Sequence, residues 1–342
     1  MPEQKQRLRH SADSEPGYTR KRIGRYWAYY DEHGKRITDR DEIERLNAIG
    51  LPPAYEQAWF SPDPQGHILA TGIDARGRKQ YRYHPGFRLH REGAKFDATA
   101  RFGRLLPKVR KRVEADLGMR ALCRDRAVAS VVRLLDTGTI RVGNEAYAKA
   151  NRSFGATTLR MRHARLAGKT LRLRFKAKSG KLRDMTLTDR ALLRFVRAMQ
   201  DLPGQHLFQY LDEEGSACPV TSTDVNAWLK ETMGEDFTAK HFRTWGASVL
   251  AYAALAHGRG EGVPLKAMLE LVADALGNTP AISRKSYVHP KLLDAVKDDP
   301  RDPLAGMERP RARKRLSTTE VALLEFLARG GKRRRKRTAV AA

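Results

Sequence analysis

Cysteine is scarce in this sequence, which contains only Cys123 and Cys218. Neither residue belongs to a Cys-x-x-Cys motif, and neither has a histidine pair near it in the sequence, so a disulfide framework and a zinc site are both unsupported. Such sparse cysteine usage is typical of a protein that works in a reducing compartment. We therefore expect no metal centre.

Long apolar runs are also missing. No stretch approaches the roughly 20 consecutive apolar residues that a membrane-spanning helix needs. The first residues, Met1 to Arg9, are polar and charged, unlike a secretory signal peptide. These two features predict a cytoplasmic protein.

Acidic residues are few relative to basic ones. The chain has 66 Lys and Arg against 39 Asp and Glu, a formal net charge of +27, and the excess is spread along the whole length. A charge of this size and distribution indicates a polyanionic partner that covers a large surface. A ribosome-bound or DNA-compacting protein without catalytic activity would carry the same charge, so composition alone does not predict an enzyme.

The order of the apolar residues predicts an α+β protein with two folded domains. Residues 1–20 show little periodicity and are expected to form a flexible lead-in. Residues 21–94 read as a small antiparallel β-sheet with one helix beside it, and residues 95–303 as a mainly helical domain with a short three-stranded sheet. Residues 304–342 are expected to form a basic accessory tail with one short helix.

Two strand predictions in the first domain are specific. Residues 25–37 predict a hairpin that turns at Gly34, and residues 79–83 predict the last strand of the sheet. Side chains alternate along a strand, so Tyr81 and Tyr83 share one face. Basic and aromatic side chains interleaved in this way suit contacts with phosphates and base edges, although the tyrosines would equally suit the inner face of the sheet. The DNA-contact candidates on this strand are Arg78, Lys79, Gln80, Tyr81 and Tyr83.

The second domain is expected to begin with amphipathic helices over residues 96–113 and 119–135. Three short strands are expected near residues 157–161, 170–176 and 182–187. The last two strands meet at a hairpin tip that carries Lys176, Lys178 and Lys181.

Two further stretches of this domain carry arginines in a rigid setting. Arg141 lies between the β-branched residues Ile140 and Val142, which favours a fixed side chain of the kind that electrostatic stabilisation needs. Lys240 and Arg243 are one helical turn apart at the start of an apolar helix. Two cations on one face repel each other unless an anion lies between them, and a phosphate at the helix N-terminus would satisfy both.

Near the end of the helical domain, Tyr287 follows a helix break that runs from Gly277 to Pro280. Its neighbours Arg284 and Lys285 are basic. A phenol has a pKa of roughly 10 in water, so a tyrosine nucleophile needs cations near it, and this stretch supplies them. From this stretch alone, a surface tyrosine on a basic helix is the favoured interpretation.

These residues together resemble the small type IB DNA topoisomerases of poxviruses and bacteria. Lys178 follows Arg141 by 37 residues and Tyr287 follows Asn278 by 9, as in that family. The resemblance extends over about residues 20–300, and it includes the strand that begins at Gly77. The family's catalytic residues map onto Arg141, Lys178, Lys240, Arg243, Asn278 and Tyr287, and Arg284 and Lys285 are expected to position phosphates.

The resemblance implies a catalytic domain of the type shared by tyrosine recombinases and type IB topoisomerases. It implies relaxation of supercoiled double-stranded DNA through a covalent 3′-phosphotyrosyl intermediate, with no ATP, metal or other cofactor. It also implies a monomer that clamps DNA, associated with the nucleoid if the source is bacterial. Lys178 would protonate the leaving oxygen with help from Lys240, while Lys176 and Lys181 remain alternatives.

Two rival functions remain open at this stage. A tyrosine recombinase would share the fold and the chemistry, but recombinases usually have histidine three residues before the second arginine, where this chain has Lys240. A DNA-compacting protein would need only the charge. The lysine and the strand after Gly77 favour the topoisomerase.

Overall fold

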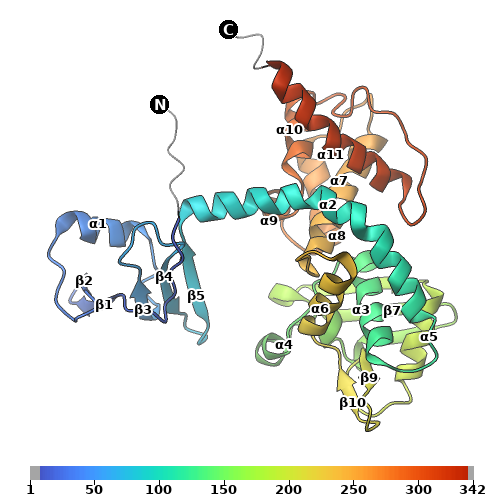
Figure 1. Ribbon diagram of the computed structural model, residues 1–342, viewed down its shortest axis with the longest axis horizontal. Coiled ribbons are helices and arrows are strands. Elements are labelled where there is room, and N and C mark those ends of the chain that lie inside the picture. The colour runs from blue at the N-terminus through green and yellow to red at the C-terminus, as the bar shows by residue number, and fades with distance from the viewer. Residues whose placement is uncertain (1–7, 338–342) are drawn as a thin grey trace. The chain divides into compact units, whose positions relative to one another are not determined.

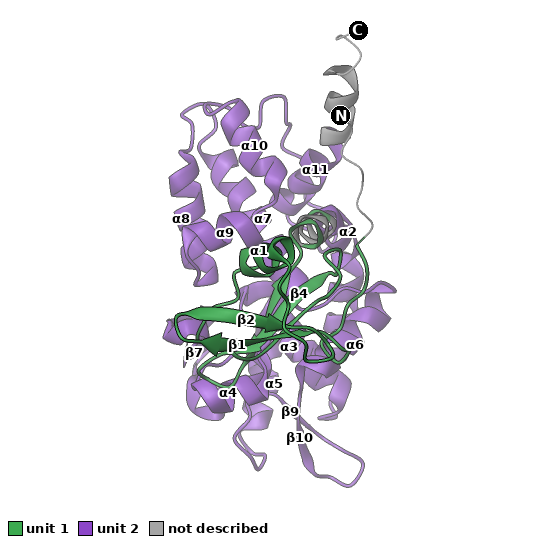
Figure 2. Ribbon diagram, turned by 90° about the vertical axis from the view of Figure 1, so that its left-hand side faces the viewer, with its two compact units in different colours: residues 1–95 green, residues 96–342 purple. Residues whose placement is uncertain are grey.

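The computed structural model describes residues 8–337, apart from the side chains of residues 88–92, 94–95 and 330–337, and the chain divides into two compact units (Figures 1 and 2). Unit 1 comprises residues 1–95 and unit 2 comprises residues 96–342. Among the described residues, none of the helices combines the length and the apolar character that crossing a membrane requires.

Unit 1 is built on a five-stranded antiparallel sheet of order β2-β1-β3-β4-β5. Its helix α1 (Arg40–Ala48) begins at Asp39, whose carboxylate accepts a hydrogen bond from the backbone N–H of Asp41. The small core gathers Tyr29, Leu46, Leu51, Phe60 and Ala70. The strands are β1 (Tyr18–Ile23), β2 (Tyr26–Tyr30), β3 (Glu56–Phe60), β4 (Ile68–Ile73) and β5 (Lys79–Tyr83).

The N-terminal part of unit 1 differs from the prediction. Part of the expected flexible lead-in is ordered: β1 begins at Tyr18, and the Ser11 hydroxyl donates to the Ile68 carbonyl at 3.0 Å. Residues 1–7 lie outside the described part. The expected hairpin over residues 25–37 is also displaced, since β2 pairs with β1 around a turn at Gly24. Residues 31–35 form a second tight turn, with only an isolated bridge between Tyr30 and Arg36.

Helix α2 (Pro85–Leu117) starts eleven residues before the helix expected at residue 96. Pro85 suits a first helical position because its fixed φ angle matches the helix and its missing N–H is not needed there. The helix then continues through residues 90–97 without a break.

Unit 2 is mainly helical and has a three-stranded antiparallel sheet of order β6-β7-β8, as predicted, so the expected fold class is confirmed. The helices are α3 (Arg124–Gly138), α4 (Glu145–Asn151), α5 (Arg190–Met199), α6 (Ser222–Met233), α7 (Lys240–His257), α8 (Leu265–Leu276), α9 (Pro280–Ser286), α10 (Pro290–Asp298) and α11 (Thr318–Arg337). The strands are β6 (Ala164–Ala167), β7 (Thr170–Lys176), β8 (Leu182–Leu187) and the short pair β9 (Gln209–Leu211) and β10 (Ala217–Pro219).

The strand predicted at residues 157–161 is absent from the structure. Short 3-10 turns occupy Ala156–Thr158 and Met161–His163 instead, and β6 begins at Ala164. The β-branched threonines suggested a strand, but their hydroxyls bond to nearby backbone. The Thr157 hydroxyl donates to the Val142 carbonyl at 2.9 Å, and the Thr158 hydroxyl accepts from the Gly155 N–H at 2.9 Å.

The C-terminal segment is an integral part of unit 2 rather than an accessory tail. Helix α11 extends to Arg337, well beyond the short helix that was expected, and Leu304, Leu316, Leu323 and Leu327 are buried in the core of unit 2. Its apolar residues recur at helical spacing, so one face of α11 packs inward. Arg315, in a first basic cluster at residues 311–315, pairs with Glu114 at 2.6 Å. The side chains of the second cluster, residues 332–337, lie outside the described part.

Candidate active site

Arg243 lies at the centre of the candidate site, on the first turn of α7. Its side chain is 3% exposed. The guanidinium donates to the carbonyl of Thr139 at 2.5 Å and to that of Leu276 at 3.1 Å. Helix α7 approaches Thr139 closely because residue 246 is glycine: a Cβ there would lie 2.8 Å from the Thr139 methyl carbon. Arg243 is therefore fixed between two loops that carry other candidate residues.

Arg141 and Asn278 come from those two loops and bond to each other. Asn278 follows Gly277, which ends α8 in the left-handed conformation with φ +64°, a conformation that favours glycine. Arg141 Nη2 donates to Asn278 Oδ1 at 2.6 Å. This bond fixes the amide, so that the Nδ2 donor of Asn278 faces the other way.

Two buried donors in this cluster lack partners among the described residues. They are Nδ2 of Asn278, a residue that is 8% exposed, and Nε of Arg243. An unsatisfied buried donor is costly, by about 1–3 kcal/mol for each group. A pair of such donors beside Arg141 is the arrangement expected of a site that binds the oxygen atoms of an anion.

Tyr287 completes the cluster at the end of α9. The Arg243 guanidinium carbon lies 4.9 Å from the centroid of the half-buried phenol ring. The main chain is also held, since the Ser248 hydroxyl on α7 donates to the Tyr287 carbonyl at 3.4 Å. The structure thus brings Arg141, Arg243, Asn278 and Tyr287 together from segments spread over more than a hundred residues of sequence.

The cluster has an electrostatic consequence for the phenol. Burial raises the pKa of Tyr287, but the positive charges of Arg243, Arg141 and Lys240 and a hydrogen bond from Arg243 outweigh burial, so the pKa lies below its ordinary value. Burial, and to a smaller extent the positive charge of Arg141, lower the pKa of Arg243 to about 10. The site therefore makes the phenolate, the nucleophilic form of tyrosine, easier to form than it is in water.

The candidate lysines occupy the rim. Lys240 is the exposed first residue of α7, and Lys178 is exposed at the tip of the β7–β8 hairpin, next to Ser179 in the left-handed conformation. Lys181 reaches the cluster directly, since its Nζ donates to the carbonyl of Asn278 at 2.9 Å. Among the three hairpin lysines, the one that contacts a site residue here is Lys181, not Lys178.

Arg183 is a site neighbour that the sequence analysis missed. It lies on β8, and its Nη1 donates to the carbonyl of Asp274 at 3.2 Å, one turn before Asn278. Burial and the charge of Arg141 both lower the pKa of Arg183. Alternation along β8, counted from Lys181, places residue 183 on the same face and was the available signal.

The candidates on β5 in unit 1 are paired with carboxylates. Arg78 and Gln80 both contact Asp74, at 2.7 and 2.9 Å, and Lys79 pairs with Asp13. Tyr81 is 40% exposed and stacks on Tyr83 with centroids 5.9 Å apart. Neither tyrosine belongs to the core cluster of unit 1, so the inner-face interpretation is not supported. On unit 2, Arg284 and Lys285 are exposed on α9.

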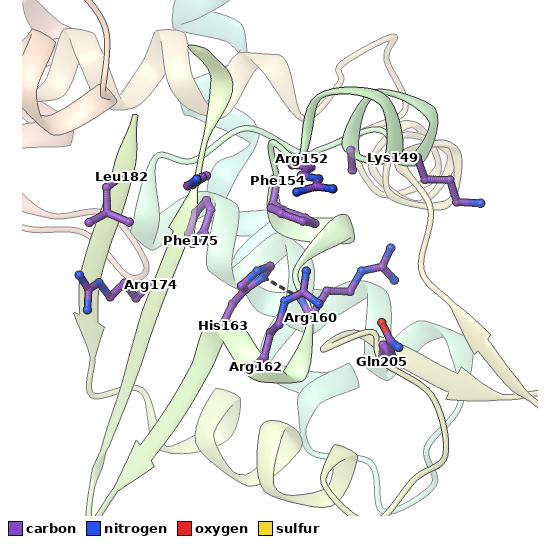
Figure 3. Close-up of a pocket in the computed structure, with 12 residues that line it drawn as sticks. Lys149, Arg152, Phe154, Arg160, Arg162, His163, Arg174, Phe175, Leu182 and Gln205 are labelled. Atoms are coloured by element: carbon purple, nitrogen blue, oxygen red, sulfur yellow. Dashed lines mark hydrogen bonds between the residues drawn. The ribbon is translucent and has the colours of Figure 1, made fainter. Parts of the chain in front are cut away.

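A separate cavity of about 670 Å³ opens between α4 and the strands β7 and β8 (Figure 3). It is lined by basic side chains, among them Arg152, Arg162 and Arg174. Lys176 is the one hairpin lysine that lines it, and the six predicted catalytic residues do not. Within the described part of the chain, no three His, Cys, Asp or Glu side chains gather as a metal-binding group.

Comparison with known proteins identifies the family of the chain. Residues 84–299 match the family described as eukaryotic DNA topoisomerase I, catalytic core, and residues 26–74 match the bacterial DNA topoisomerase IB N-terminal domain. DNA topoisomerase 1B of Acanthamoeba polyphaga mimivirus is 32% identical over 299 residues, 83% of this chain and 88% of the relative. DNA topoisomerase 1B of vaccinia virus, strain Copenhagen, is 20% identical over 290 residues, 79% and 90% of the two chains.

Among solved structures, the XerH site-specific recombinase bound to palindromic difH substrate in a post-cleavage complex aligns with a TM-score of 0.37 at 18% identity, covering 55% of this chain and 50% of that chain. A TM-score of this size carries no argument about function. The two family matches and the mimiviral relative decide the assignment: the chain belongs to the type IB DNA topoisomerases and is an isomerase.

Proposed function

We propose that this topoisomerase relaxes supercoiled DNA by cutting and resealing one strand through Tyr287. The Tyr287 phenolate attacks a backbone phosphorus, a P–O bond to tyrosine forms, and the bond from phosphorus to the 5′ oxygen breaks. The 3′ end is then held as a phosphotyrosine while the free 5′-hydroxyl end rotates. Attack by that hydroxyl reverses the step and releases the tyrosine.

The observation that carries this proposal is the pair of unsatisfied donors beside Tyr287. Negative charge on the non-bridging oxygens of the phosphate grows as the phenolate adds, and fixed donors aimed at those oxygens stabilise it. Arg243 Nε and Asn278 Nδ2 are buried and have no hydrogen-bond partner in the described part of the chain, and Arg141 holds the amide in place. The amide of asparagine does not ionise and cannot act as a general acid, so the role of Asn278 is to donate a hydrogen bond.

The leaving 5′ oxygen must take up a proton, and a lysine on the rim is the available donor. We assign this role to Lys178, with Lys240 assisting. Both are exposed in the free protein and neither is paired with a carboxylate among the described residues. A general acid of this kind contributes about 10²- to 10⁴-fold to the rate.

The same chemistry needs neither ATP nor a divalent metal. The phosphotyrosine keeps the energy of the broken phosphodiester, so resealing requires no second source. The positive charge that a metal ion supplies to phosphates in other enzymes comes here from Arg141, Arg243 and the lysines. Relaxation should therefore proceed in EDTA without nucleotide.

Binding is assigned to double-stranded DNA, held by a single chain that closes around it. Arg284 and Lys285 on α9, and the β5 residues Arg78, Lys79, Gln80, Tyr81 and Tyr83, are the proposed contacts. Exposed cations of this kind act through phosphates, so affinity should fall steeply as salt rises.

The test of this function is Tyr287→Phe, which removes only the hydroxyl. The variant should lose plasmid relaxation and the covalent protein–DNA adduct while it binds DNA as the wild type does. Tyr210→Phe, at another half-buried tyrosine of unit 2, is the matched control and should keep both activities. Relaxation by the Tyr287→Phe variant would show that the nucleophile lies elsewhere. A randomly chosen supercoiled plasmid is the right substrate, because a recombinase would need its paired target sites.

A further inference from the structure

The C-terminal helix α11 brings a buried carboxylate, Glu320, against the helix that carries Arg243. Glu320 is 6% exposed and lies beyond residue 299, where the match to the catalytic-core family ends. Its oxygens accept from Arg110 at 2.7 and 3.0 Å and from the indole N–H of Trp245 at 3.1 Å. Burial raises the pKa of Glu320, but Arg110 outweighs burial, so its pKa lies below the ordinary value.

Trp245 lies two residues after Arg243 on α7, and its indole is held on two sides. One side is the bond to Glu320. The other is α2, where residue 103 is glycine: a Cβ there would lie 2.3 Å from the indole ring. Trp245 is 3% exposed. The position of this ring therefore depends on a close contact with α2 and on a hydrogen bond to α11.

Arg110 ties the same junction to a third helix. Besides Glu320, its guanidinium donates to Asp136 on α3 at 2.8 and 2.9 Å. Helix α3 ends directly before Thr139, whose carbonyl holds Arg243. The network of Glu320, Arg110 and Asp136 thus joins α11, α2 and α3 around the first turns of α7.

Helix α11 also contacts the helix that follows Tyr287. Lys291 on α10 donates from Nζ to the carbonyl of Leu327 at 2.8 Å. The ring of Phe326 packs edge-on against Tyr252 of α7, with centroids 5.9 Å apart. Helix α11 therefore contacts both α7, which carries Arg243, and α10, which follows Tyr287.

We propose that Glu320 is a positioning residue for strand cleavage, which acts through Trp245 to hold Arg243 against Tyr287. The role rests on the function proposed for Tyr287. Glu320 itself touches no reacting atom. A small displacement of Arg243 weakens both its contact with the phenol and its donation to the phosphate, and displacements of about 1 Å at such sites cost up to 10²-fold in rate.

The experiment compares Glu320→Gln with Glu325→Gln on the same helix. Glutamine keeps the shape of Glu320 but turns one accepting oxygen into a donor that faces other donors, whereas Glu325, whose side chain is 39% exposed, pairs with Arg313. With a DNA strand cleaved in a single turnover at saturating enzyme, Glu320→Gln should lower the cleavage rate constant about tenfold. Its DNA affinity should be unchanged, and its pH–rate profile should move to higher pH. Glu325→Gln should match the wild type in all three.

Trp245→Phe keeps an aromatic ring in place and removes the N–H donor, so it provides a second test of the same hydrogen bond if Glu320→Gln folds poorly. It should show the same pH displacement, and the double variant should be no slower than the slower single variant, because both changes break one contact. Folded variants that cleave at the wild-type rate, with only a lower melting temperature, would overturn the proposal. Failure of the wild type to form any covalent adduct would instead contradict the function proposed for Tyr287.

Discussion

The cations of strand β5 in unit 1 and the arginines of the candidate active site in unit 2 are held in opposite ways. On β5 of unit 1, Arg78 and Lys79 pair with the carboxylates of Asp74 and Asp13. In unit 2, Arg141 and Arg243 are held by an amide and by backbone carbonyls, and the ion pairs found among the described residues include neither of them. Both sets fix the cation, but only the first neutralises it.

The difference separates a binding surface from a reacting one. A carboxylate can be exchanged for a phosphate as DNA binds, so pairing costs a surface cation only some affinity. A carboxylate in the active site would cancel the field that lowers the pKa of Tyr287 and would compete with the phosphate for the donors. Holding arginine with neutral acceptors keeps its full charge available.

The largest effect should come from comparing two exposed lysines, one from each unit. Lys178→Ala should lower the single-turnover cleavage rate by about 10²- to 10⁴-fold, because the leaving oxygen loses its proton donor. Lys79→Ala should change affinity and leave the rate at saturating DNA within a few-fold, since Lys79 already pairs with Asp13.

A substrate with sulfur in place of the 5′ oxygen sharpens that result. A thiolate leaves without protonation, so it should restore cleavage by Lys178→Ala. A different result would assign the general acid to Lys181, which contacts Asn278. In that case Lys178→Ala would cleave at the full rate, while Lys181→Ala would be slow and the sulfur-containing substrate would restore its cleavage.

A smaller loss is expected from putting a carboxylate into unit 2. Asn278→Asp changes few atoms, but it pairs Arg141 with a charge and removes the unsatisfied donor. Cleavage should slow by about 10²- to 10³-fold, the cost of losing one oxyanion donor. The added charge raises the pKa of Tyr287, so the phenolate forms at higher pH and the rising limb of the pH–rate profile should move upward.

Asn47→Asp in unit 1 is the matched control for that variant, because either side chain accepts from the Tyr29 hydroxyl. It should leave the profile in place. If Asn278→Asp cleaves at the wild-type rate, the absence of a carboxylate beside Arg141 is not what separates the active-site arginines from the cations of β5.

The smallest effect is expected from releasing a cation in unit 1. Asp74→Asn keeps the oxygen that accepts from the turn backbone but frees Arg78 from its ion pair. DNA affinity at low salt should rise about threefold, and the gain should shrink as salt rises. Asp63→Asn removes the same charge from a pair with exposed Arg9 and tests whether the gain belongs to β5 or to net charge.

The elements best predicted from the sequence are those whose ends are marked by a glycine in the left-handed conformation. Strand β8 matches the predicted range of residues 182–187, because a turn that contains Gly180 in the left-handed conformation precedes it. Strand β1 was missed because its consecutive residues Arg20, Lys21 and Arg22 hide the alternation. Arg20 nevertheless turns inward, where the Leu51 carbonyl accepts its proton at 2.8 Å.

The candidate site shows a similar division. Spacing singled out Arg141, Asn278 and Tyr287, since each follows a turn or break visible in the sequence. It could not show that Asn278 bonds to Arg141, that Lys181 reaches the site, or that Glu320 supports α7. These are long-range contacts made by side chains that look like ordinary surface charges in sequence. The burial of the C-terminal segment was missed for the same reason.

The most direct test is to find the atom that holds the DNA. Wild-type protein is trapped in covalent complex with an oligonucleotide whose cleaved end cannot be resealed, and the linked peptide is identified by mass spectrometry after proteolysis and nuclease digestion. We predict a nucleotide attached through its 3′ phosphate to Tyr287, the residue beside the Arg243 guanidinium. Attachment to any other residue, or through a 5′ phosphate, would contradict it.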